Sequence, residues 1–178
     1  NGLQLFMGDV NDNDGVLEDG EGAACVLCHV ANFAPDPGNV VVPLWSPKGL
    51  IPPMFTDFTY DNLGVPVNLD IADLIGPQPA DLGLGAIVND TAEDGKFKVM
   101  TLRNIGLTAP YAHNGFFADL EGITNFYNTR DVAGEGWAPP EVPDTVNDQE
   151  LGNLGLSATD EADLVEFMKT LDDGWTAP

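Results

Sequence analysis

The chain is 178 residues long and 43% hydrophobic, and its 29 acidic and six basic residues give a formal net charge of −23. This length and apolar content predict one domain over residues 1–178 with a real core. The charge makes nucleic acid and anionic lipid poor partners. Because no run of about 18 apolar residues is present, we predict no membrane span.

The chain begins with a predicted short helix and an acidic segment. Leu3, Phe6 and Met7 recur at helical spacing. Residues 9–21 then mix acidic residues with Asn and Gly, a composition that suits either a calcium loop or a solvated acidic insertion. Val10 stands at the first-ligand position of an EF-hand loop, so the template fails and we favour the insertion.

The run Cys25-Val26-Leu27-Cys28-His29 is the attachment signature of a c-type haem. Thiols three residues apart can form thioethers to the two vinyl groups, and the adjacent His29 supplies an imidazole to the iron. Two alternatives use the same residue types: a redox-active C-x-x-C, usually near a βαβ pattern not seen here, and a zinc site. His29 lies directly beside Cys28, which disfavours tetrahedral zinc geometry, so we predict one covalently bound haem c.

The remainder of the chain is predicted to form loops and helices. Residues 32–66 are rich in Pro and Gly and predict a long loop. Short helical turns are expected at 69–75 and 78–84, and a helix at 119–128. Ser157 with Asp160 predicts the capped start of a last helix, whose apolar stripe is Leu164, Phe167, Met168 and Leu171. The pattern predicts a mostly α, single cytochrome c-type haem domain with long Pro/Gly-rich loops.

Several of these stretches resemble the bacterial dihaem cytochrome c peroxidase / MauG family. The most specific is F-K-V-x-T-L-R-N-x-x-L-T-A-P-Y-x-H-N-G over residues 97–115, and the others lie at 55–58, 62–66, 154–157 and 163–168. The resemblance implies the C-terminal half of that family, which holds the electron-accepting haem. It also implies two partners, a second haem domain or subunit and a redox donor, and the charge suggests that the donor is basic.

The sixth iron ligand decides the chemistry of such a haem. The resemblance places Tyr127 at the position where relatives carry a Met or Tyr ligand. Met100 is the main alternative, and the other candidates are Met7, Met54, Met168 and His113. A phenolate ligand favours ferric iron and lowers its potential, whereas Met raises it.

The resemblance also implies roles around the haem. His113 is expected beside the haem and Arg103 at a propionate, although Arg103 in so acidic a chain also suits a surface salt bridge. The backbone carbonyls of Thr108 and Pro110 match family positions that help to bind Ca²⁺ between two haem domains.

Three functions follow as hypotheses. We favour an electron-transfer domain of a peroxidase-type system, which would be an oxidoreductase when assembled with a second haem domain. The alternatives are peroxide or oxygen chemistry at this haem itself, and a structural or sensory haem module. No signal peptide is visible and haem c is normally attached outside the bacterial cytoplasm, so we expect a mature, periplasmic or extracellular form.

Overall fold

The computed structural model describes residues 1–8, 22–23, 25–30, 54–76 and 78–174. The acidic segment 9–21 and most of the loop expected at 32–66 lie outside these ranges. Within them the chain is mainly helical, with one short two-stranded antiparallel sheet that pairs Tyr60 with Lys98 and Asp61 with Phe97. No helix in the described ranges is long and apolar enough to cross a membrane. The elements in chain order are α1 (Gly2–Met7), the 3₁₀ turn η1 (Cys25–Leu27), β1 (Tyr60–Asp61), α2 (Leu69–Ile75), α3 (Leu84–Val88), η2 (Thr91–Glu93), β2 (Phe97–Lys98), η3 (Ile105–Leu107), α4 (Leu120–Thr129) and α5 (Ala158–Lys169).

Most of the expected helices are confirmed, and one is wrong. Helices form at 2–7, 69–75, 120–129 and 158–169, and Ser157 caps α5 in a capping box with Asp160. The turn expected at 78–84 is instead irregular through Gly83, and the helix runs over Leu84–Val88. Gly83 accounts for the shift: its φ is +52°, and a Cβ there would meet the Lys96 carbonyl oxygen at 2.4 Å.

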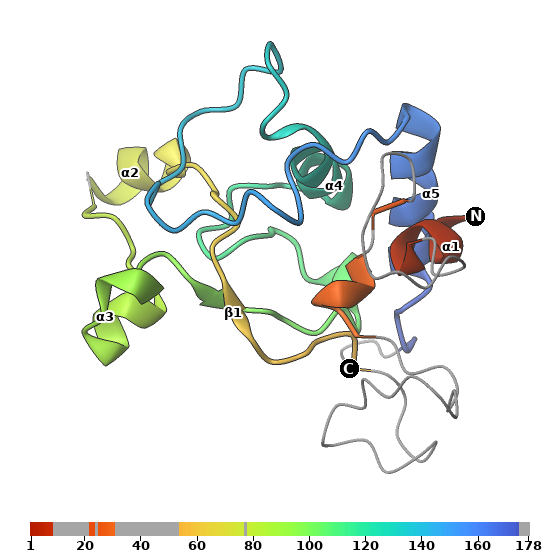
Figure 1. The fold of residues 1–178 in the computed structure, drawn as a ribbon, viewed down its shortest axis with the longest axis horizontal. Helices are drawn as coiled ribbons and strands as arrows, with labels where there is room; N and C mark the ends of the chain where they lie inside the picture. Colours follow the sequence, from red (N-terminus) through yellow and green to blue (C-terminus); the bar gives the residue numbers. More distant parts are fainter. Residues whose placement is uncertain (9–21, 24, 31–53, 77, 175–178) are drawn as a thin grey trace.

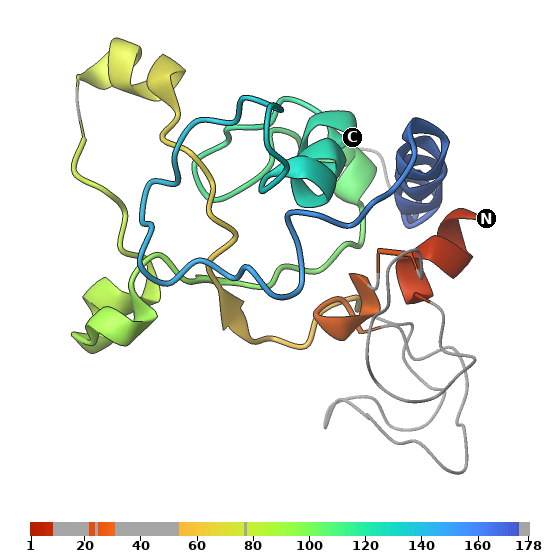
Figure 2. The same ribbon diagram turned by 45° about the horizontal axis from the view of Figure 1, so that its top comes forward.

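The first core cluster joins the two ends of the chain. Helices α1 and α5 lie side by side in Figures 1 and 2, apart from α2 and α3 on the opposite side of the fold. The helices approach so closely that a Cβ on Gly2 would meet the Asp163 carbonyl oxygen at 2.0 Å. Phe6 packs against Phe167 of α5 with ring centroids 5.0 Å apart, and against Phe55 at 5.9 Å. This cluster therefore brings the segment at Phe55 against both terminal helices.

The second core cluster gathers aromatic rings around α4. Phe126 is fully buried and lies 4.9 Å from Phe117 and 5.1 Å from Trp137, measured between ring centroids. Val165 of α5 belongs to this cluster, whereas Leu164 belongs to the first. Helix α5 thus contacts both core clusters through neighbouring residues. Its buried apolar surface is therefore wider than the stripe expected from the sequence.

Arg130, which directly follows α4, forms hydrogen bonds that join the end of this helix to two other segments of the chain. Its guanidinium donates to the carbonyl oxygens of Leu63 and Asn147, both at 2.8 Å, and to the carboxylate of Asp131. Only 6% of the side chain is exposed, so its hydrogen bonds to the two carbonyl oxygens are shielded from water, whereas the Asp131 side chain is 43% exposed.

We expect Arg130→Met to lower the free energy of unfolding by about 3 kcal/mol, because buried carbonyl oxygens lose charge-assisted donors. Chemical denaturation at pH 7 measures the change. Lys169→Met is the matched control, since its ion pairs with Glu121 and Glu166 are exposed and contribute little. Equal losses in the two variants would contradict this role for Arg130.

The Arg130–Asp131 pair also predicts a pH dependence of stability. The hydrogen bond from Arg130 lowers the pKa of Asp131 below its ordinary value of 3.8. The stabilisation is therefore complete above about pH 4 and is lost as the pH falls through the lowered pKa. We expect the stability gap between the native protein and Asp131→Asn, measured by denaturation, to narrow between pH 7 and pH 3; a constant gap would refute this.

Candidate haem-binding site

A cavity of about 730 Å³ opens between the C-x-x-C-H segment, residues 95–113 and helices α4 and α5. This volume lies within the range of roughly 300–1,000 Å³ typical of cofactor and ligand pockets. Its wall is largely apolar, with contributions such as Leu102, Leu120 and Leu164. The sequence-predicted residues that line it are Cys25, Cys28, His29, Met100, Arg103, Thr108, Pro110, His113 and Tyr127.

The C-x-x-C-H segment forms one tight turn in the cavity wall. The His29 amide donates to the Cys25 carbonyl oxygen at 2.8 Å, which places both cysteines and the histidine on one turn around η1. The Asp57 amide donates to the Cys28 carbonyl oxygen at 2.9 Å. The turn is thereby fastened to the segment that follows residue 53.

The ring of His29 is oriented by a backbone carbonyl. Its Nδ1 lies 2.9 Å from the carbonyl oxygen of Phe55, and because a carbonyl only accepts, Nδ1 carries the proton. Nε2 is then the nitrogen with a lone pair for a metal. Burial lowers the pKa of His29, although the Phe55 hydrogen bond partly opposes this, so the imidazole is neutral and suited to ligation.

Phe55 adopts an unusual backbone conformation to present that carbonyl. Its φ is +52°, in the left-handed region that a bulky side chain rarely occupies. The ring is 1% exposed and packs against Phe6 and Phe167, and the guanidinium carbon of Arg103 lies 5.3 Å from its centroid. Packing therefore holds the backbone in a conformation that orients His29.

The two cysteines do not resemble redox-active thiols. Burial raises the pKa of Cys25 and Cys28 to about 12 each, and for Cys28 the carboxylates of Glu150, Asp57 and Asp61 raise it further. Reactive C-x-x-C thiols instead have lowered pKa values. In the described residues His113 does not join the cysteines in a metal-ligating group, as a zinc site built from two Cys and two His would require.

These residues fit a covalently bound haem c. The cavity wall is apolar, as a porphyrin requires, two thiols lie on one turn at its edge, and a neutral imidazole is oriented beside them. Such a haem, when bound, supplies one-electron redox chemistry at its iron. The protein supplies the attachment, the oriented ligand and the dry surroundings.

Four of the six candidates for the sixth ligand line the cavity, and two do not. Tyr127 and Met168 line the cavity from α4 and α5, elements distinct from the turn that carries His29. Met100 also lines it, but it is 62% exposed. Met7 and Met54 are not in the wall. Burial raises the pKa of Tyr127 well above its ordinary value, so its phenol is protonated without a metal.

His113 and its neighbours form a polar corner of the cavity. The imidazole stacks on the ring of Phe97 with centroids 3.9 Å apart, and its Nε2 lies 3.1 Å from Glu141 Oε2. Asn114 donates to the Pro66 carbonyl oxygen at 2.8 Å and steadies the same corner. His113 thus lines the cavity, as the resemblance implies, with a carboxylate already at its ring nitrogen.

Sequence reasoning missed three groups of the site. The Phe55 carbonyl is a backbone feature with no side-chain signal. Asp61 and Glu150 lie beside Cys28, with the possible ligand atoms of all three within 4.8 Å of one another, and Asn147 donates to both carboxylates at 2.7 Å. Because 89 residues separate the two acids, no motif could indicate that they converge.

Comparison with known proteins finds relatives among MauG and cytochrome-c peroxidase proteins. No family model matches the chain. The methylamine utilization protein MauG of Paracoccus denitrificans is 38% identical over 135 residues, which is 67% of this chain and 35% of MauG. The cytochrome-c peroxidase IdrP2 of a Pseudomonas species is 39% identical over 52% of this chain and 21% of its own length. The chain therefore spans about a third or less of the curated relatives it matches.

Solved structures of a dihaem peroxidase and a MauG-like protein match nearly the whole chain. The dihaem peroxidase BthA of Burkholderia thailandensis matches with a TM-score of 0.68 and 26% identity, covering 97% of this chain and 42% of BthA. A MauG-like protein associated with microbial copper homeostasis matches with a TM-score of 0.60 and 26% identity, over 97% and 43% of the two chains.

Removing both thiols tests the attachment site directly. We expect Cys25→Ala/Cys28→Ala protein to retain no haem after denaturing electrophoresis or in its intact mass, because no other cysteine is present. Each single variant should keep one thioether and shift the haemochrome spectrum. Haem that stays covalently bound to the double variant would contradict the assignment.

Proposed function

Because the chain belongs to the dihaem cytochrome c peroxidase / MauG family, we propose that it is a c-type haem electron-transfer domain of such a system. It passes single electrons between a donor protein and a partner haem held on a second domain or subunit. The observation that carries this proposal is the cavity wall: an oriented His29 on one element and a ligand-capable Tyr127 on another. An iron held from both sides needs no substrate at the metal to transfer electrons.

Tyr127 is the sixth ligand in this proposal. It lines the cavity from α4, whereas Met100 is 62% exposed. In the free protein the phenol is protonated, so ligation as phenolate requires the iron charge to replace the proton. A phenolate ligand lowers the reduction potential relative to Met.

We also propose, for the residues around the haem, the roles that the resemblance implies. Arg103 lines the cavity and its guanidinium lies beside Phe55, and in this proposal it pairs with a propionate. His113 acts from the polar corner of the cavity, where it pairs with Glu141. Calcium binding by the carbonyls of Thr108 and Pro110, and a periplasmic or extracellular location, remain part of the proposal.

Peroxide or oxygen chemistry at this haem is the second candidate function. Asp61 and Glu150 are carboxylates in the cavity wall, and such groups can transfer protons to and from a bound oxygen species. This function requires an open sixth position, which distinguishes it from electron transfer.

Spectroscopy of the ferric, haem-loaded protein separates the two functions. We expect one haem per chain and a six-coordinate, low-spin EPR spectrum that does not change on addition of peroxide. A high-spin, five-coordinate spectrum that peroxide alters would replace electron transfer with catalysis at this haem.

Matched substitutions identify the sixth ligand. Tyr127→Phe should convert the spectrum to a high-spin or methionine-ligated form and raise the reduction potential, while Met100→Leu should leave both unchanged. If instead Tyr127→Phe leaves the spectrum as it was and Met100→Leu alters it, Met100 is the ligand.

A further inference from the structure

We propose that Asp61 and Glu150, held together by Asn147, lower the reduction potential of the haem that is attached at Cys28. We call the two acids the carboxylate pair, and the inference rests on the proposed electron-transfer function. The structure brings a carboxylate oxygen of each acid and the Sγ atom of Cys28 within 4.8 Å of one another, and all three residues line the cavity. In haem c this sulfur is bonded to the macrocycle, so the pair lies at the edge of the redox centre.

Asn147 keeps the carboxylate pair together. Its side-chain amide donates to Asp61 Oδ2 and to Glu150 Oε2, both at 2.7 Å. Its backbone is itself anchored, because its amide donates to the Asn62 carbonyl oxygen at 2.9 Å and its carbonyl oxygen accepts from the Arg130 guanidinium at 2.8 Å. Two like charges repel one another, so without this side-chain amide the carboxylates would move apart. Asn147 is therefore a positioning residue that concentrates negative charge at the cavity wall.

The basic side chains of the cavity wall lie against aromatic rings. Lys98 Nζ is 4.7 Å from the centre of the Phe58 ring, and the guanidinium carbon of Arg103 is 5.3 Å from the centre of the Phe55 ring. Among the described residues no salt bridge joins either cation to the carboxylate pair. In this part of the chain the pair is thus stabilised by hydrogen bonds to a neutral amide, which leave its negative charge in place.

A negative charge beside a haem favours the ferric state. Reduction adds one electron to the iron, so the centre becomes more negative by one charge, while no bond forms or breaks and no proton is transferred. Coulomb repulsion from the carboxylate pair therefore opposes reduction and lowers the potential. A phenolate from Tyr127 acts in the same direction. The haem of this chain is thus suited to rest in the ferric form and, once reduced, to give its electron to an oxidised partner.

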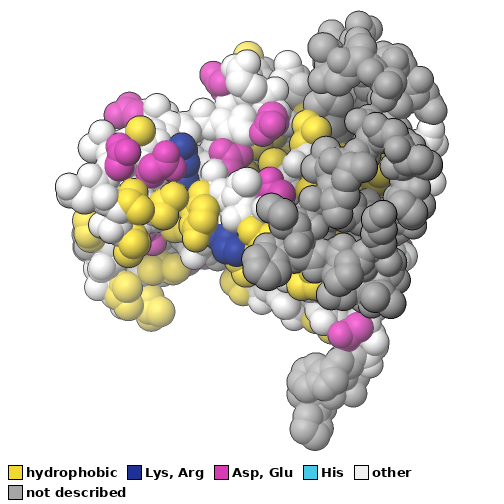
Figure 3. Space-filling view, turned by 60° about the horizontal axis from the view of Figure 1, so that its bottom comes forward, with side chains coloured by type: hydrophobic (Ala, Val, Ile, Leu, Met, Phe, Trp, Pro, Cys, Tyr) yellow, Lys and Arg dark blue, Asp and Glu magenta, His cyan; other side chains and the backbone are white. Residues whose placement is uncertain are grey.

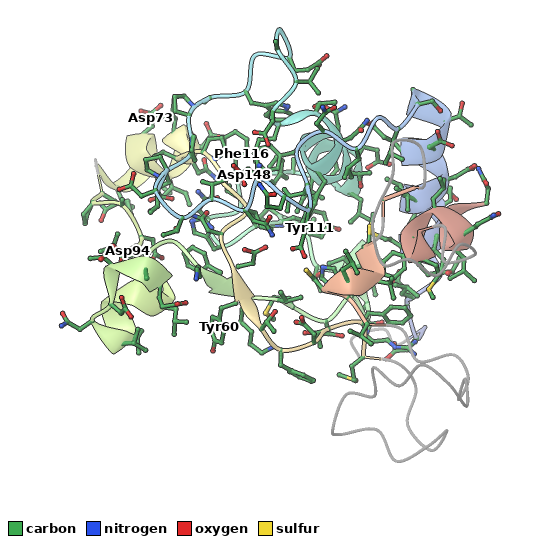
Figure 4. The ribbon with its side chains drawn as sticks, in the orientation of Figure 1. Tyr60, Asp73, Asp94, Tyr111, Phe116 and Asp148 are labelled. Carbon is green, nitrogen blue, oxygen red and sulfur yellow. The ribbon has the colours of Figure 1, made fainter. Side chains whose placement is uncertain are left out.

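Position, and not the overall acidity, distinguishes the carboxylate pair. Figure 3 shows acidic side chains spread over one face of the molecule, among hydrophobic ones and a few basic ones. Asp70 and Asp73 on α2 are exposed acids outside the cavity wall, and Asp73 is labelled in Figure 4 on the side of the fold away from the C-x-x-C-H turn. At physiological ionic strength, exposed charges more than about 8 Å apart are largely screened. Acids such as these two therefore have little effect on the haem.

The experiment measures the midpoint potential of the haem-loaded protein at pH 7 by spectroelectrochemical titration, at low and at high salt. Asp61→Asn/Glu150→Gln removes both charges and keeps the side-chain shapes, and Asn147→Leu keeps both charges but removes the amide between them. The matched control, Asp70→Asn/Asp73→Asn, removes two charges from α2. The visible spectrum of each protein reports whether the axial ligands are unchanged, so that a shift in potential is assigned to charge alone.

We expect the double variant to favour the ferrous state about tenfold more than the native protein does, which raises the potential by about 59 mV for one electron. Asn147→Leu should shift the equilibrium about threefold in the same direction, and the control less than about twofold. The difference should shrink at high salt, because Glu150 is exposed.

An unchanged potential in the double variant, or an equal shift in the control, refutes the role of the carboxylate pair while the proposed function stands. A potential that rises in the double variant but not in Asn147→Leu refutes the positioning role of Asn147. If the native haem shows no reversible one-electron couple, the proposed electron-transfer function itself fails.

Discussion

The hydrogen bond from His29 Nδ1 to the Phe55 carbonyl is the contact on which the site depends. It joins the haem-attachment turn to a segment 26 residues later, and it leaves Nε2 as the ligating nitrogen. The carbonyl is available because Phe55 is held in the left-handed region by a ring buried against α1 and α5. The geometry of a metal ligand is thus determined by apolar packing between the two ends of the chain.

The cavity exists because the protein divides its apolar side chains between two clusters. One cluster forms around Phe6, Phe55 and Leu164, and the other around Phe126, Phe117 and Val165. Helix α5 supplies neighbouring residues to both, so the clusters form connected walls with a space between them large enough for a macrocycle. The acidic groups stay at the edge of this space, near Cys28, where they act on the surface electrostatics of the site.

Local sequence patterns predicted the helices well, because amphipathic spacing and the Ser157 capping box act within a few residues. The C-x-x-C-H run similarly predicted that two thiols and an imidazole come together on one turn, because its geometry is local. The shift of the helix from 78–84 to Leu84–Val88 was not predictable, because it arises from the approach of Lys96 to Gly83. The contacts of Asp61, Glu150 and Arg130 were not predictable for the same reason. Their partners are distant in sequence, and no local pattern indicates a tertiary contact.

The packing of α1 against α5 has a consequence for the order of folding. The N-terminal helix, the haem-attachment turn and Phe55 all contact a core that is complete only when the last helix has been synthesised. Contacts of such long sequence separation form late, because the chain must first lose the entropy of closing a long loop. During synthesis from the N-terminus the two thiols therefore precede their own enclosure. A haem held by these thiols would therefore be enclosed only once α5 has packed against α1 and Phe55.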